Sequence, residues 1–122
     1  MASIYDQHDK AFSQVSAYVI AKDGKKVGTI AFRFPRDGAS RLWCYLRVSG
    51  FRMVRGYAGG YGYDKASAAA ASAARGLRDP KINEFGQDDA LLLEIAGILD
   101  RDDGYGWDRN LREVGFDVWQ AV

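Results

Sequence analysis

The residues of this chain that could carry covalent chemistry are few and stand far apart. There is one cysteine, Cys44, and one histidine, His8. A cysteine nucleophile needs a neighbouring base or positive charge that lowers the pKa of its thiol. Cys44 instead stands at an apolar position of an alternating segment, which predicts a side chain in the core, and no His or Asn is placed to activate it. We therefore expect no catalytic site and no enzyme activity.

A glycine-rich segment could in principle hold phosphate. Residues 56–63 contain four glycines and three tyrosines and precede an alanine-rich stretch. Free backbone N–H groups at the start of a helix favour anions. The segment lacks the Gly-Lys-Ser/Thr end of a P-loop, however, and Asp64 at the expected helix N-cap would repel a phosphate. We expect a loop that turns a strand into a helix, and no cofactor.

An acidic segment resembles a calcium loop only in part. Asp100, Asp102 and Asp103 precede Gly104, but the spacing is one residue short of the EF-hand pattern. The twelfth position, which supplies a bidentate Glu in that pattern, is Leu111. An exposed acidic loop without a metal ion is the expected outcome.

The first two predicted strands form a hairpin. Residues 15–22 and 25–34 are rich in Val, Ile, Phe and Tyr and flank Asp23-Gly24, a dipeptide typical of type I′ turns. A two-residue loop would pair Ala17 with Ile30 and Val15 with Phe32. One side of the hairpin would then hold Val15, Ala17, Val19, Ile30, Phe32 and Phe34, and the reverse would hold Tyr18, Ile20, Val27, Thr29 and Arg33.

A second hairpin is predicted from residues 41–48 and 51–57 across Ser49-Gly50. Its apolar side, which we assign to the core, comprises Leu42, Cys44, Leu46, Val48, Phe51 and Met53. Its reverse side comprises Arg41, Trp43, Tyr45, Arg47, Arg52 and Val54.

Helices dominate the second half of the chain. Seven alanines and two serines fill positions 66–74, which predicts a helix over 65–75 that is capped by Asp64, is ended by Gly76 and Pro80, and lies close to the sheet. Further helices are predicted over 88–100 and 107–114, and a closing strand over 116–122. The fold class is therefore α+β: an antiparallel sheet of four to five strands, packed on one face by two or three helices. We expect a single domain, residues 1–122, with residues 1–13 loosely ordered.

The charge of the chain is unevenly distributed, although its net value is only +1. Residues 1–65 hold 11 Lys/Arg against 5 Asp/Glu, and residues 66–122 hold 6 against 11. This split indicates one basic and one acidic surface, or two halves that neutralise each other. The single cysteine and the absence of an apolar leader or a long apolar run lead us to expect a soluble cytoplasmic protein without membrane contact.

The predicted hairpins leave an aromatic and basic face toward solvent. Such a face can bind a partner protein, because aromatic residues and Arg dominate interfaces, or single-stranded nucleic acid, by stacking on bases and pairing with phosphates. Two alternatives are that Trp107 or Trp119 covers it, hiding its arginines against the acidic half, or that it forms a homodimer interface. The predicted partner-binding residues are Tyr18, Arg33, Trp43, Tyr45, Arg47, Arg52, Tyr57, Tyr61 and Tyr63.

One short match is coincidental: Arg55-Gly56-Tyr57-Ala58 fits the first four positions of an RNA-recognition signature, but the chain leaves the signature at Gly59 and lacks the helix that this family places between its first two strands. The phrases GYGYDKASAAAASAA and GWDRNLREVGFDVWQAV resemble small proteins encoded by phages, prophages and plasmids, some of them anti-defence proteins of the anti-CRISPR kind. This resemblance implies a compact, non-catalytic inhibitor that occupies the surface of a host protein or nucleoprotein complex.

Overall fold

The computed structural model describes residues 12–35, 42–58, 65–83, 89–101 and 106–121, with 12–15, 34 and 35 described as backbone. The elements follow in the order β1 (Phe12–Lys22), β2 (Lys25–Pro35), β3 (Leu42–Val48), β4 (Val54–Ala58), α1 (Lys65–Arg78), α2 (Ala90–Leu99), α3 (Trp107–Glu113) and β5 (Asp117–Gln120). This order is the one the sequence predicted.

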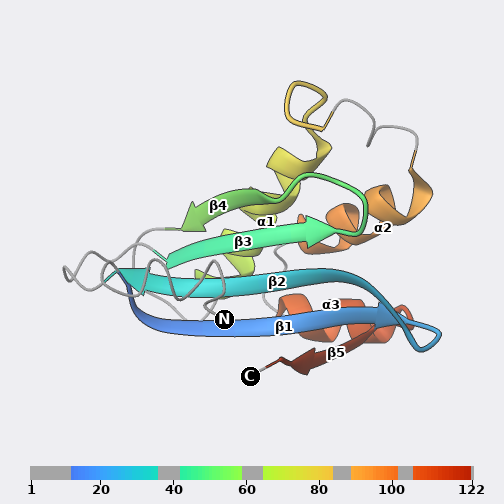
Figure 1. Cartoon of the computed structure of the whole chain (residues 1–122), viewed down its shortest axis with the longest axis horizontal. Helices are drawn as coiled ribbons and strands as arrows, with labels where there is room; N and C mark the ends of the chain where they lie inside the picture. The colour runs from blue at the N-terminus through green and yellow to red at the C-terminus, as the bar shows by residue number, and fades with distance from the viewer. Residues whose placement is uncertain (1–11, 36–41, 59–64, 84–88, 102–105, 122) are drawn as a thin grey trace.

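The five strands form one antiparallel sheet in the order β4-β3-β2-β1-β5. The three helices lie on one side of it, with α1 behind β3 and β4 and α3 next to β5 (Figure 1). The predicted α+β class is confirmed. Within the described ranges, no helix has the length and apolarity needed to cross a membrane.

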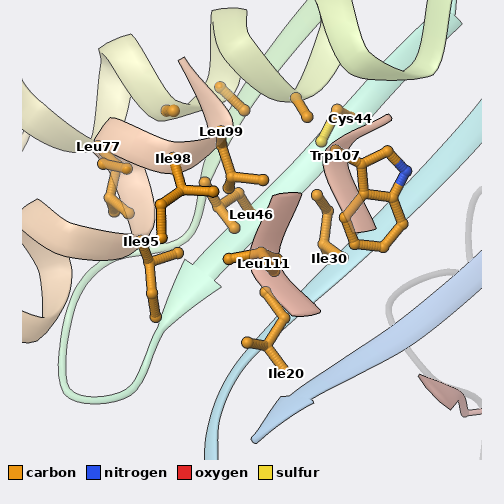
Figure 2. Close-up of a cluster of buried hydrophobic side chains, with 14 of the residues drawn as sticks. Ile20, Ile30, Cys44, Leu46, Leu77, Ile95, Ile98, Leu99, Trp107 and Leu111 are labelled. Atoms are coloured by element: carbon orange, nitrogen blue, oxygen red, sulfur yellow. The ribbon is translucent and has the colours of Figure 1, made fainter. Parts of the chain in front are cut away.

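The core lies between the sheet and the helices. Strand β3 alternates as predicted, with Leu42, Cys44, Leu46 and Val48 buried beneath the helices. Figure 2 shows side chains of α2 and α3 meeting those of β2 and β3 in this layer. Burying these apolar groups is the main free-energy term that holds the helices on the sheet.

Helix α1 lies close to the sheet because small residues face each other there. Ala69, Ala70, Ala73 and Ala74 are fully buried, and a Cβ placed on Gly56 of β4 would lie 2.2 Å from the backbone nitrogen of Ala73. The close approach predicted from the alanine run is therefore confirmed. It fixes β4, and the residues β4 carries, firmly against the helix.

Helix α1 does not end at Gly76, as the sequence had predicted, but continues to Arg78. A Cβ on Gly76 would meet side chains at ordinary contact distances, so this glycine is an interior helix residue. Burial of Leu77, which has no exposed surface, outweighs the modest helix penalty of glycine. The predicted N-cap, Asp64, lies outside the described residues.

The register of the first hairpin differs from the prediction by one residue. Ala21 pairs with Lys26 and Ile20 pairs with Gly28, so Val27 is an extra residue on β2 and forms a β-bulge. From Ile20 back to Gln14 the β1 residues are displaced by one, so Ala17 faces Ala31 instead of Ile30.

This shift exchanges the two faces of β1, because side chains alternate along a strand. Tyr18 and Ile20 point toward the helices, whereas Ala17 and Val19 belong to the other face. The assignment of Tyr18 to the reverse face is therefore wrong.

The second hairpin is also shifted. The pairing begins at Leu46 with Val54, so the connection between the strands is longer than the predicted Ser49-Gly50. Val54, predicted on the reverse side, is buried in the core. Met53, predicted in the core, is only half-buried, while Phe51 packs against the edge of the core.

The remaining elements agree with the sequence. Asp89 caps α2 by accepting a hydrogen bond from the N–H of Leu92, with 2.8 Å between the two atoms. Helix α3 gives way to β5 through Gly115, whose φ of 100° favours glycine. These termini hold α2 and α3 in place over the sheet.

Candidate functional site

The face of the sheet turned away from the helices, here called the outer face, combines aromatic and basic side chains. Register places Thr29 beside Arg47, Trp43 beside Tyr57, and Tyr45 beside Arg55 across neighbouring strands. Arg47, Arg55 and Tyr57 are exposed, and Trp43 and Tyr45 are half-buried. The outer face over β3 and β4 therefore presents rings and guanidinium groups to solvent.

These side chains contact one another directly. The rings of Trp43 and Tyr57 have centroids 5.1 Å apart at an angle of 50°. The guanidinium carbon of Arg55 lies 5.5 Å from the centre of the Trp43 ring, and that of Arg33 lies 5.3 Å from the Tyr45 ring. Both contacts have the geometry of cation–π interactions. They reduce the freedom of the side chains, so less ordering remains to be done when a partner binds.

The exposed arginines of the outer face are not neutralised within the described residues. Arg47, Arg52 and Arg55 form no ion pair there, and β2, β3 and β4 contain no Asp or Glu. Arg47 donates one hydrogen bond, from Nε to the carbonyl of Phe51 at 3.1 Å. The basic surface is therefore available to an anionic group.

Among the described acidic residues of the second half, Glu94 pairs with Lys22 of β1 at 3.6 Å, and the others that form ion pairs do so with arginines of the helices. Asp100 lies 3.0 Å from Arg75 and 3.2 Å from Arg78, and Asp108 lies 2.8 Å from Arg112. These are pairs within or between helices. Within the described residues, the alternative that acidic residues of the second half cover the outer-face arginines is therefore wrong for Arg47, Arg52 and Arg55.

Two of the predicted binding residues are not exposed on the outer face: Tyr18 is partly buried on the helical side of the sheet, and Arg33 is buried. Tyr18 packs edge-on against Phe32 and Trp107, with ring centroids 6.3 Å and 5.1 Å away. Arg33 belongs to the outer face but is only 1% exposed.

The other predictions fall into two groups. The structure brings Trp43, Tyr45, Arg47 and Tyr57 together on the outer face, and Arg52 lies at its margin, where it lines a hollow with Tyr45. Tyr61 and Tyr63 lie outside the described residues.

The two C-terminal tryptophans do not cover the arginines of β3 and β4. Trp107 is buried on the helical side of the sheet, near Ile30 and Cys44 (Figure 2). Trp119 is 49% exposed and lies on β5, where it pairs with Val19 of β1. Strands β1 and β2 therefore separate it from the arginines of β3 and β4. The proposal that Trp107 covers the outer face is wrong.

Sequence reasoning missed Arg55 as a member of the outer face. The signal was present in β4, where Arg55 and Tyr57 alternate with the buried Val54 and Gly56. A two-residue turn at Ser49-Gly50 predicts the opposite alternation for β4, with Arg55 facing the core. The longer connection also brings Met53 to the outer surface.

Cys44 lies in the core, as predicted, and is a free thiol. Burial raises the pKa of this thiol far above its ordinary value. Among the described residues, no three His, Cys, Asp or Glu side chains are grouped so that they could hold a metal ion.

We predict that Cys44 will not react with a thiol reagent in the folded protein at neutral pH. The raised pKa leaves almost no thiolate, and the side chain has no exposed surface. Labelling with an aromatic disulfide should be negligible in buffer and complete in denaturant. Rapid labelling in buffer would contradict the burial of Cys44.

The chain matches no family model, and no curated protein or solved structure compared with it is significantly similar to it.

Proposed function

We propose that this chain is a non-catalytic binding protein that recognises an anionic partner through the outer face over β3 and β4. The observation that carries the proposal is the contact of Trp43 with both Tyr57 and Arg55, on the same face as Arg47, which forms no ion pair with any described residue. Tyr57 is 50% exposed in this arrangement. An exposed aromatic residue next to arginines is the composition that dominates binding hot spots.

Charge determines the kind of partner. The exposed residues of β2, β3 and β4 carry only positive charges, so the complementary surface is negative. The resemblance to proteins of phages and plasmids adds a biological setting, in which the partner is a host protein or nucleoprotein complex. The chain would inhibit this partner by covering its surface.

The test compares capture by matched variants. Immobilised wild-type protein, the double variant Arg55→Ala/Tyr57→Ala and the control Arg109→Ala are exposed to host lysate, with and without nuclease. Arg109 is an exposed arginine of α3, on the helical side of the sheet. Bound proteins are identified by mass spectrometry, bound nucleic acid by ultraviolet absorbance, and the fold of each bait by circular dichroism.

We expect wild type and Arg109→Ala to capture the same partner and the double variant to lose at least about tenfold, because hot-spot residues cost about 2 kcal/mol or more when truncated. Equal capture by all three folded baits would disprove the assignment of the outer face.

A further inference from the structure

Two adjacent hollows, one on the outer face and one where this face ends at β4, suggest what kind of anion fits there. The first, of about 340 Å³, is lined by Lys26, Gly28, Thr29, Arg47, Ser49, Gly50 and Met53. The second, of about 680 Å³, is lined by Tyr45, Arg52, Met53, Val54, Arg55 and Ile82. Because Met53 lines both, the hollows adjoin each other at the long connection between β3 and β4.

The first hollow has the chemistry of a phosphate site. Lys26 and Arg47 supply positive charge, Thr29 and Ser49 supply hydroxyl groups, and no carboxylate lines it. The bond from Arg47 Nε to the carbonyl of Phe51 fixes the guanidinium group, while its two terminal nitrogens make no hydrogen bond within the described residues. A guanidinium held in this way can donate two parallel hydrogen bonds to a phosphate.

The second hollow combines a ring with further arginines. Tyr45 lines it together with Arg52 and Arg55, and Ile82, which is 39% exposed, adds an apolar side chain. The next outer-face pair along β3 is Trp43 with Tyr57, roughly 7 Å away at the usual rise of a strand. The rings of Tyr45 and Trp43 therefore follow one another along β3, next to the first hollow.

This combination favours nucleic acid over an acidic peptide. Carboxylates would pair with the arginines but would make no stacking contact with the rings of Tyr45 and Trp43. Unpaired bases stack on such rings while their phosphates pair with Lys and Arg. In a duplex the faces of the bases are already stacked, so the rings select a single strand.

We infer that the outer face binds single-stranded nucleic acid, with a phosphate in the hollow lined by Lys26 and Arg47 and bases against Tyr45 and the Trp43–Tyr57 pair. This inference rests on the proposed function and specifies the partner. The affinity is independent of sequence, because stacking and phosphate contacts do not read base edges.

The test is a fluorescence-anisotropy titration with labelled mixed-sequence single-stranded DNA and RNA at several salt concentrations. The proteins are wild type, Lys26→Ala/Arg47→Ala, Tyr57→Ala and the control Arg109→Ala, each checked for fold by circular dichroism. Duplex DNA and poly-L-glutamate serve as competitors.

The two kinds of contact have separate signatures. Loss of the phosphate held by Lys26 and Arg47 should lower the slope of log K against log salt by about 0.7, since each phosphate neutralised on a single strand contributes about 0.7. Tyr57→Ala should keep the slope and weaken binding roughly 5- to 150-fold, the range for loss of one stacked base. Arg109→Ala should behave as wild type.

Undetectable binding at low salt would overturn this inference, as would equal competition by poly-L-glutamate or an unchanged salt slope in Lys26→Ala/Arg47→Ala. Such a failure is distinguishable from failure of the proposed function. If the Arg55→Ala/Tyr57→Ala variant still fails to capture the partner that wild type captures from lysate, the outer face is a binding site for a partner other than single-stranded nucleic acid.

Discussion

Replacing Gly56 by alanine should destabilise the protein by about 3 kcal/mol or more, although the substitution adds one methyl group. The new Cβ would lie 2.2 Å from the backbone nitrogen of Ala73 and 2.6 Å from the backbone carbonyl carbon of Ser72. Overpacking of a core typically costs about 1–3 kcal/mol when side chains can adjust, and more when they cannot. Here helix α1 itself has to move away from β4.

Gly97→Ala is the matched control for this prediction. Gly97 lies inside α2, and a Cβ there would have no neighbouring atom within 4 Å. Alanine should therefore stabilise the protein by about 0.5–1 kcal/mol through its higher helix propensity. Urea denaturation followed by far-ultraviolet circular dichroism measures both effects, and a Gly56→Ala midpoint equal to that of wild type would contradict the close packing of α1 on β4.

The packing of Gly56 also affects the outer-face residues on either side of it. In Arg55-Gly56-Tyr57-Ala58, glycine lies against α1, whereas Arg55 and Tyr57 point to the outer face. The N–H of Tyr57 donates to Oγ of Ser72 at 3.3 Å, which ties the strand to the same helix. Gly56→Ala should therefore disturb the position of Tyr57 as well as the stability of the protein.

Replacing Trp107 by alanine should cost about 3–5 kcal/mol, the range for truncation of a large buried aromatic residue. Its ring is 8% exposed and packs between Tyr18, at 5.1 Å, and Phe32, at 5.3 Å. Its backbone N–H donates to Oγ of the buried Ser67 at 3.1 Å, so the residue also joins α3 to α1. Truncation would leave a cavity among elements from three parts of the chain.

Trp119→Ala is the control for Trp107→Ala, since Trp119 is 49% exposed on β5. Its truncation should change the free energy of unfolding by no more than about 0.5 kcal/mol. Similar denaturation midpoints for the two tryptophan variants would show that Trp107 does not anchor the core. Trp107→Phe should recover part of the loss by refilling the space between Tyr18 and Phe32.

Local pattern determined the elements of this protein and the two faces of β3. Leu42, Cys44 and Leu46 alternate with Trp43, Tyr45 and Arg47, and only one of these sets is wholly apolar and uncharged. Burial of the other set would have cost the desolvation of Arg47, so the orientation of this strand could be read without a structure.

Strand β1 offered no such contrast. Val15, Ala17 and Val19 on one side and Tyr18 and Ile20 on the other are all compatible with a core, so its orientation depended on pairing with β2. The bulge at Val27 decided it, and no local signal distinguishes a bulged hairpin from a regular one at this position.

What the sequence by itself determined was the order of helices and strands, the α+β class and the outward orientation of Trp43, Tyr45 and Arg47. The tertiary structure alone decided that Tyr18 supports the core, that Arg33 is buried, and that Arg55 joins the outer face. The physical reason is that alternation relates residues within one strand, whereas register between strands depends on bulges and connection lengths. A displacement of one residue exchanges the two faces of a strand.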